Sequence, residues 1–169
     1  MQIRHSHIDD LEAIRAIYAR ARAFIAEQGN PDQWGDSWPP DELLLSDING
    51  DNADCGFVCE HDGRVVGVFF FKVGDDDTYA YIEDGSWADD SPYGVVHRVA
   101  TDGTVKGVGA FCINWAFEQC GHLHIDTHGD NVPMQNLLRK LGFEHRGTIY
   151  VHEDNAPRLA FEKSAPPRG

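Results

Sequence analysis

Residues 95–113 combine two apolar runs with a loop that contains three glycines, Gly103, Gly107 and Gly109. Residues 95–101 have the composition of a buried strand, and an apolar helical segment begins at residue 110. The first turn of a helix carries unpaired backbone N–H groups and the positive end of the helix dipole. Glycine has no side chain, so it lets a phosphate approach these donors closely. The order strand, glycine loop, helix therefore predicts a phosphate-binding site.

A second candidate segment lies at residues 126–143 and contains another helical stretch. Asn131 stands where this helix would begin, and the sequence Leu-Leu-Arg-Lys-Leu-Gly-Phe closes it at residues 137–143. Gly142 is placed to end the helix, since glycine readily adopts the left-handed conformation that follows a last turn. Phe143 would then begin the next strand.

Together the two segments resemble the acetyl-CoA-binding motifs of the GNAT superfamily of N-acetyltransferases. The pyrophosphate loop of that family is written Arg/Gln-x-x-Gly-x-Gly/Ala, and it falls on residues 104–109. Gly107 and Gly109 match, whereas Thr104 stands in place of Arg or Gln. Asn131 matches the asparagine that contacts the pantetheine arm of the cofactor. The resemblance covers roughly residues 2–163 and implies one N-acetyltransferase domain over residues 1–169, with a frayed tail at 164–169.

One position departs from the family in a way that affects the chemistry. The closing pattern of the family is Leu-Tyr-x-Lys-x-Gly-Phe, and its tyrosine often protonates the departing CoA thiolate. Leu138 occupies that place and cannot donate a proton. Another group or water would do this work, or the chain would bind the cofactor without turnover. A thiolate with a pKa near 8.5 does not strictly need a strong acid at neutral pH.

The resemblance implies a specific set of cofactor contacts. Backbone N–H groups of residues 105–109 would hold the pyrophosphate, and the edge of residues 99–101 would pair with the pantetheine amides like an added strand. The backbone N–H of Val99 would polarise the thioester carbonyl, as an oxyanion hole does. The predicted cofactor-binding residues are Val99, Ala100, Thr101, Thr104, Val105, Lys106, Gly107, Val108, Gly109, Ala110, Asn131, Met134 and Asn136.

His97 is the predicted general base. An amine must be neutral to attack a thioester, so a nearby base or a water relay is required. His97 lies on the strand just before the loop, where the family often places a substrate-side group, and imidazole titrates near neutral pH. In a regular strand Arg98 would point to the opposite face. The alternative interpretation of His97 is a partly buried residue bonded to the neighbouring backbone.

Four polar or aromatic residues are predicted to face the acceptor substrate. Glu83 lies close to Trp87 and could recognise a cationic group, although acidic loop residues are often simply solvated. Asp126 and His128 lie at the end of a predicted strand and could act as a secondary base. The predicted reaction is direct attack of a primary amine, on a small molecule or a peptide, on acetyl-CoA in a ternary complex.

The alternation of His122, His124, Asp126 and His128 also suggests a metal site. A strand would place these side chains on one face while Leu123 and Ile125 face the core. Imidazole and carboxylate suit zinc, and the spacing resembles the H-x-H-x-D-H motif of metallo-β-lactamase-type hydrolases. It differs from that motif by one residue, and the chain is short for that fold. We therefore expect no metal, and keep a metal-dependent hydrolase and a non-catalytic CoA-binding module as alternatives.

The excess of acidic residues indicates which classes of binding partner to expect. Among 169 residues, 28 Asp and Glu stand against 14 Lys and Arg, for a formal net charge of −14. This excess repels phosphate backbones and anionic lipids, so neither nucleic acid nor membrane is expected as a partner. It would attract cationic amines, although an acidic surface also simply favours solubility. The GNAT resemblance is also compatible with a homodimer, because dimers are common in that superfamily.

Four cysteines without C-x-x-C spacing, at Cys55, Cys59, Cys112 and Cys120, suit buried thiols in a reducing compartment. No secretory signal pattern is visible, and no apolar run approaches the roughly 20 residues that would span a bilayer. These features predict a cytoplasmic protein.

Hydrophobic periodicity predicts an α/β fold with a mixed sheet. The GNAT resemblance implies that this central sheet is mostly antiparallel, with six to seven strands and helices on both faces. The run at residues 65–71 is apolar on both faces, which predicts a central strand. Helices are expected at residues 10–28, 40–48, 110–120 and 131–141; strands are expected at residues 2–5, 56–60, 64–73, 78–83, 95–101, 122–126, 143–152 and 158–163.

Overall fold

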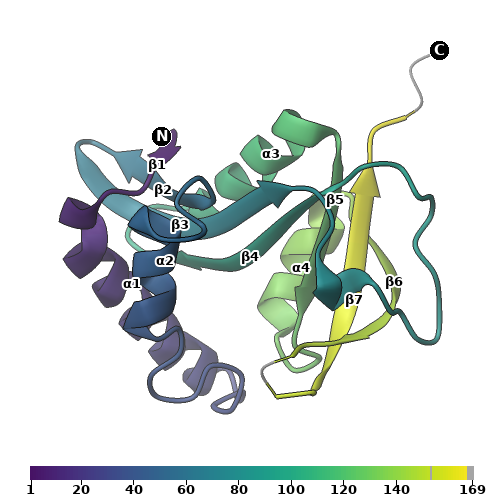
Figure 1. The fold of residues 1–169 in the computed structure, drawn as a ribbon. Coiled ribbons are helices and arrows are strands. Elements are labelled where there is room, and N and C mark those ends of the chain that lie inside the picture. Colours follow the sequence, from purple (N-terminus) through teal and green to yellow (C-terminus); the bar gives the residue numbers. More distant parts are fainter. Residues whose placement is uncertain (153, 167–169) are drawn as a thin grey trace. The chain divides into compact units, whose positions relative to one another are not determined.

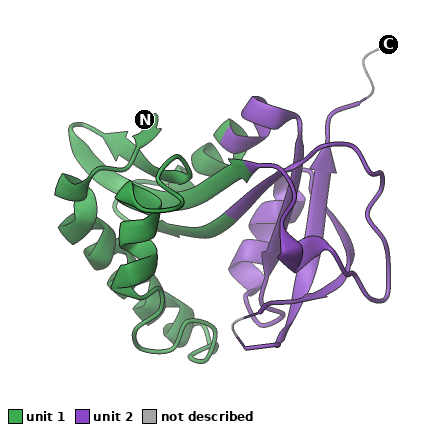
Figure 2. Ribbon diagram, in the orientation of Figure 1, with its two compact units in different colours: residues 1–72, 97–115 green, residues 73–96, 116–169 purple. Residues whose placement is uncertain are grey.

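The computed structural model describes residues 1–152 and 154–166, and its chain forms two compact units (Figure 1). Unit 1 contains Met1–Lys72 and His97–Trp115, and unit 2 contains Val73–Val96 and Ala116–Gly169 (Figure 2). The boundaries between the units fall within β3 (Arg64–Val73), β4 (Gly94–Thr101) and α3 (Val108–Cys120), each of which contributes residues to both units. Among the described residues, no helix is long and apolar enough to cross a membrane.

The strands are hydrogen-bonded in the order β1-β2-β3-β4-β5-β7-β6. The pair β4–β5 is parallel, whereas β1–β2, β2–β3, β5–β7 and β6–β7 are antiparallel. This confirms the predicted mixed sheet. The strands are β1 (Gln2–His5), β2 (Gly56–His61), β3 (Arg64–Val73), β4 (Gly94–Thr101), β5 (His122–Thr127), β6 (Glu144–Tyr150) and β7 (Pro157–Ser164). The helices are α1 (Leu11–Glu27), α2 (Asp41–Asn49), α3 (Val108–Cys120) and α4 (Val132–Lys140).

In unit 1, helices α1 and α2 cover one face of the strands. Their apolar stripes form one buried cluster with the strand residues Val58 and Val68. The helix residues of this cluster recur at intervals of three and four, which places them on one side of each helix. They are Ile14, Ile17, Tyr18, Leu44 and Ile48.

The first part of α3 covers the other face of the unit 1 strands. The Trp115 ring lies 5.0 Å from the ring of Phe57 and 6.0 Å from that of Phe69, measured between centroids. Gly67 lets the helix come close, because a Cβ atom there would lie 2.6 Å from Cγ1 of Val108. The predicted central strand is confirmed, since β3 has buried residues on both of its faces.

In unit 2, strands β5 and β7 bury residues on both faces. Leu123 and Ile125 are buried on one side of β5, and the alternate residues His122 and His124 are buried on the other. Arg139 of α4 stacks its guanidinium 5.6 Å from the Phe161 ring of β7, so α4 contacts the strand face that bears Phe161.

The predicted strand at residues 78–83 is wrong. The segment begins as a short 3-10 helix, Asp77–Tyr79, in which the Asp76 carboxylate accepts a hydrogen bond from the Thr78 N–H. Only Glu83 pairs with a strand, through one bridge to Thr148 of β6. The side-chain cap satisfies the backbone locally, so the chain does not need a sheet partner there.

The chain end is more ordered than expected near residue 164. Strand β7 includes Ser164, and the Ala165 N–H donates a 2.7 Å hydrogen bond to the Gly121 carbonyl. The rest of the expected tail, residues 167–169, lies outside the described residues.

Candidate functional site

The loop between β4 and α3 is organised by Asp102. Its carboxylate accepts hydrogen bonds from the backbone N–H of Thr104 at 2.9 Å and from the Thr104 hydroxyl at 2.7 Å. The Asp102 N–H in turn donates to the Val66 carbonyl of β3 at 3.0 Å. These bonds fix the start of the loop against the sheet of unit 1.

Gly107 makes the turn into the helix. Its φ of +80° lies in the left-handed region, which glycine adopts without the steric cost of a Cβ atom. The first turn of α3 starts at Val108, two residues earlier than predicted, and the Phe111 N–H donates to the Gly107 carbonyl at 2.9 Å. Gly109 and Ala110 therefore lie in the first turn, where backbone N–H groups have no partner within the helix.

Arg64 is a candidate cofactor residue that the sequence analysis missed. This exposed arginine begins β3, and its Nη2 lies 3.4 Å from Oγ1 of Thr104, which takes the place of the family's Arg or Gln. The positively charged side chain of Arg64 thus reaches the β4–α3 loop from the β2–β3 hairpin. No local sequence pattern signals it, because the contact joins residues 40 positions apart.

Strand β4 is interrupted at Arg98, which has a φ of +55°. The regular alternation of side chains is therefore lost at Arg98. The prediction that Arg98 points to the face opposite His97 is wrong. The His97 ring centroid lies 5.6 Å from that of Phe70, and the Arg98 guanidinium carbon lies 5.0 Å from the same ring. Both side chains therefore contact one aromatic ring, immediately before Val99.

Two side chains from the helices of unit 1 stabilise the left-handed conformation of Arg98. The Tyr18 hydroxyl donates to the Arg98 carbonyl at 2.8 Å, and Arg98 Nη2 donates to Asp47 Oδ2 at 2.5 Å. The Arg98 and Asp47 side chains are only 14% and 11% exposed. Burial raises the pKa of the Asp47 carboxyl, and the Arg98 guanidinium opposes this shift.

In unit 2, Asn131 begins helix α4. Its side-chain Oδ1 accepts a hydrogen bond from the Met134 N–H at 3.2 Å, which caps the helix. Leu138 is completely buried. The position at which the family carries its tyrosine is therefore part of the apolar interior of this chain.

Asp126 and Trp87 are linked through Tyr79. The buried Tyr79 hydroxyl donates to Asp126 Oδ1 at 2.7 Å, and the Trp87 indole N–H donates to the Tyr79 carbonyl at 3.0 Å. Burial, reinforced by the Asp126 charge, raises the pKa of Tyr79 well above its ordinary value. The phenol thus stays protonated and holds the carboxylate in place.

Glu83 is fixed at the edge of β6. Its backbone exchanges two 2.8 Å hydrogen bonds with Thr148, and its carboxylate accepts a 2.5 Å hydrogen bond from the Tyr150 hydroxyl. This hydrogen bond raises the pKa of Tyr150. The candidate acceptor residues Glu83, Trp87 and Asp126 are thus each bonded within unit 2.

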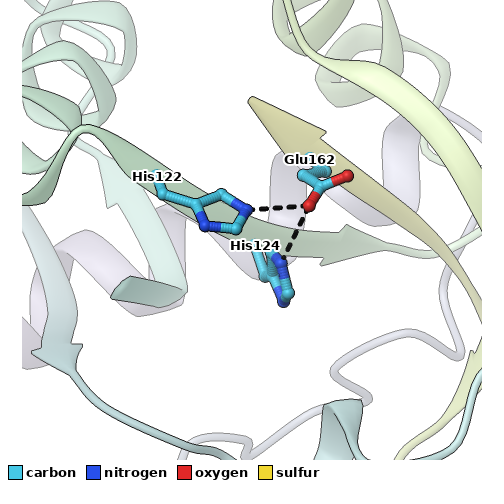
Figure 3. Close-up of side chains that lie close together, drawn as sticks. All are labelled: His122, His124 and Glu162. Carbon is cyan, nitrogen blue, oxygen red and sulfur yellow. Dashed lines mark hydrogen bonds and ion pairs between the residues drawn. The ribbon is translucent and has the colours of Figure 1, made fainter. Parts of the chain in front are cut away.

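The row of alternating histidines is not gathered into one site. Asp126 is bonded to Tyr79, and His128 lies beyond β5 with its Nδ1 accepting from the Asp130 N–H at 3.1 Å. His122 and His124 instead meet Glu162 of β7, which the sequence analysis did not use (Figure 3). Register pairs Glu162 directly with His124, a relation that only the sheet topology reveals.

The pKa values of His124 and Glu162 in this cluster are both lowered, for different reasons. Burial lowers the pKa of His124 to about 4, so its ring is neutral at pH 7. Burial opposes ionisation of Glu162, but hydrogen bonds from His122 and from the Ala88 N–H outweigh it and lower the pKa of the carboxyl. The cluster therefore presents a carboxylate to two imidazole rings.

Comparison with known proteins identifies a family. Residues 12–143 match the model of the family described as acetyltransferase (GNAT) family. A GNAT-family acetyltransferase from Streptococcus agalactiae is 28% identical, with 98% of this chain and 95% of that chain covered and a TM-score of 0.86. A search of curated proteins gave no match.

More distant structures share the fold. A ribosomal-protein-alanine N-acetyltransferase from Brucella melitensis is 21% identical, with 98% of this chain and 100% of that chain covered and a TM-score of 0.60. A phosphinothricin acetyltransferase from Sinorhizobium meliloti, solved in complex with acetyl-CoA, is 16% identical, with 96% and 87% covered and a TM-score of 0.62.

We predict that Gly85→Ala destabilises the segment that carries Glu83 and Trp87. An added Cβ atom would lie 1.8 Å from the Arg146 carbonyl oxygen, so the backbone must move. Forced overpacking of this kind costs about 1–3 kcal/mol, to be measured as the loss in unfolding free energy in urea. Gly129→Ala is the control, because a Cβ atom there meets nothing within 4 Å. Equal stability of the two variants would contradict the prediction.

Proposed function

Because the chain belongs to the GNAT family of acetyltransferases, we propose that it transfers an acetyl group from acetyl-CoA to a primary amine. The observation that carries this proposal is the β4–α3 loop, in which a left-handed Gly107 leads into the unpaired N–H groups of a helix. Such a loop suits the pyrophosphate of CoA in charge and in shape.

The loop residues have separate roles in the proposed cofactor site. The backbone of residues 104–110 binds the pyrophosphate, with positive charge from Lys106 and from Arg64. Residues 99–101 pair with the pantetheine amides. Asn131, Met134 and Asn136 are the remaining candidate cofactor contacts. The acetyl-CoA complex of the Sinorhizobium structure supports the choice of donor, as a property of that protein.

In the proposed reaction the neutral amine attacks the thioester carbonyl carbon directly, without an acyl-enzyme. His97, directly or through water, takes the proton that the amine loses, and the Val99 N–H stabilises the oxyanion. The tetrahedral intermediate collapses with cleavage of the C–S bond. CoA leaves as a thiolate that water can protonate, since Leu138 has no proton to give.

The acceptor is proposed to be cationic. Glu83, Trp87, Asp126 and His128 are its candidate contacts, and the net charge of −14 favours the approach of a protonated amine. Such an amine must lose its proton before attack, which is why a base is part of the proposal.

A non-catalytic CoA-binding protein is the second candidate, and the buried Leu138 favours it. A panel of primary amines with acetyl-CoA distinguishes the two, with free thiol as the readout. We expect at least one cationic amine to release CoA above the rate of thioester hydrolysis. Binding of acetyl-CoA by calorimetry without thiol release from any amine would support the second candidate. The absence of binding would contradict both.

We predict that Gly107→Val weakens acetyl-CoA binding by about tenfold or more, the equivalent of one lost charge-assisted hydrogen bond. Valine resists the left-handed conformation, so the turn must change and displace the phosphate-binding N–H groups. Gly29→Val is the matched control. Gly29 has a φ of +88°, and, as at Gly107, a Cβ atom would meet nothing within 4 Å, but it follows the end of α1. Calorimetry should show a changed Kd only for Gly107→Val, and equal affinities would refute the loop assignment.

We predict that His97→Gln lowers kcat by roughly 10²–10⁴, the usual contribution of general acid–base catalysis. The Kd for acetyl-CoA should stay unchanged, because the phosphates bind elsewhere. A variant that keeps its rate would exclude His97 and point to Asp126 or His128.

A further inference from the structure

Three buried side chains in unit 2 direct possible metal-ligand atoms at one point. His122 Nε2 lies 2.7 Å and His124 Nε2 lies 3.3 Å from the same atom, Oε1 of Glu162 (Figure 3). The two histidines alternate on β5 and the glutamate faces them from the adjacent strand β7, so the backbone of the sheet fixes all three. Their side chains are 5%, 2% and 1% exposed.

Hydrogen bonding at its outer nitrogen leaves His122 with Nε2 directed at the cluster. The Ser91 hydroxyl has one proton, and it donates this proton to the Asp89 carboxylate. The Ser91 oxygen, 2.9 Å from Nδ1 of His122, is then an acceptor, so Nδ1 must be the donor. The other nitrogen, Nε2, faces the carboxylate of Glu162 and is the atom available to a metal ion.

The surroundings of His122 and Glu162 resemble those of a metal site. Ligating histidines usually donate their second N–H to an oxygen acceptor that fixes the ring, and His122 has Ser91 and Asp89 in that place. The second oxygen of Glu162 is already used, by the Ala88 N–H at 2.9 Å and in an ion pair with Arg146 Nε at 2.9 Å. Oε1 is thus left for the cluster centre.

The His124 ring is also held in a fixed orientation. It is stacked between Trp87 at 3.8 Å and Tyr93 at 3.9 Å, measured between ring centroids. Its ligand atom therefore cannot rotate away without breaking two stacking contacts.

We propose that His122, His124 and Glu162 bind one divalent ion of the zinc class through Nε2, Nε2 and Oε1. Zinc takes imidazole and carboxylate ligands at about 2.0–2.2 Å, so tetrahedral ligand atoms lie roughly 3.4 Å apart. The observed separations of 2.7 and 3.3 Å require shifts of a few tenths of an ångström or more. Binding displaces the Nε2 protons, and a water molecule completes the coordination.

This ion has a structural role in the proposal. The segment between β3 and β4 contacts the cluster through Trp87, Ala88, Ser91 and Tyr93. Fixing the cluster therefore fixes the segment that carries Glu83. The ligand set differs from the row considered in the sequence analysis, because Glu162 enters and Asp126 and His128 do not. The proposal does not depend on the proposed acetyl transfer.

Cobalt(II) is the probe, since a four-coordinate Co²⁺ ion absorbs visible light far more strongly than the hydrated ion. The full chain is stripped of metal with a chelator and titrated with Co²⁺. We expect intense visible bands that saturate at one ion per chain, and displacement of Co²⁺ by Zn²⁺ with a rise in Tm. Stripped protein that gives no such bands, or no rise in Tm with Zn²⁺, overturns the proposal.

Variants distinguish this site from adventitious binding. Glu162→Gln and His124→Gln should lose the bands. Ser91→Ala changes only a residue outside the ligand set, so it should keep the bands and weaken Co²⁺ binding by about 10–100-fold. This variant keeps the test decisive if the ligand variants fail to fold. His61→Gln removes a histidine beside Asp62 in the β2–β3 hairpin and should change nothing. Bands that survive Glu162→Gln, an unchanged affinity in Ser91→Ala, or a loss in His61→Gln would each refute the site.

Discussion

The left-handed residue in strand β4 is the constraint on which the candidate chemistry of unit 1 depends. A non-glycine residue at a φ of +55° is strained and persists only where its surroundings enforce it. Here the enforcing groups are the Tyr18 hydroxyl on the Arg98 carbonyl and the Asp47 carboxylate on its guanidinium. Both come from helices that pack on the sheet, so the hydrophobic cluster of α1 and α2 determines where His97 and Val99 lie.

Hydrogen bonds to polar groups hold the second candidate region as well. In unit 2 the long segment before β4 is bonded at three places: Tyr79 on Asp126, Glu83 on Thr148, and Ala88 on Glu162. Each bond uses a polar group that would be costly to bury alone, so each specifies one arrangement of the segment. A loop that presents candidate acceptor contacts is thereby positioned by the sheet.

Local sequence patterns predicted most of the helices and strands. Contacts between residues that lie far apart in the sequence could not be predicted. The apolar run of β3, the glycine turn before α3 and the Gly142 stop of α4 each follow from neighbouring residues. Arg64 at the loop and Glu162 beside His124 follow only from strand pairing. The left-handed Arg98 had no local signal, because its cause lies in two helices. The strand predicted at residues 78–83 failed because a side-chain cap replaced a sheet partner.

The absence of the family tyrosine affects departure of the CoA thiolate and leaves deprotonation of the amine unaffected. Leu138 is completely buried, so a phenol there would need a buried hydrogen-bond partner and a repacked core. The leaving thiolate has a pKa near 8.5 and is stable enough in water to depart without an acid. A protonated primary amine holds its proton to a pKa near that of lysine, about 10.4, and cannot attack until that proton is removed. Deprotonation of the amine is therefore the step that needs a catalytic group. For this reason an acetyltransferase can lose its general acid more readily than its general base.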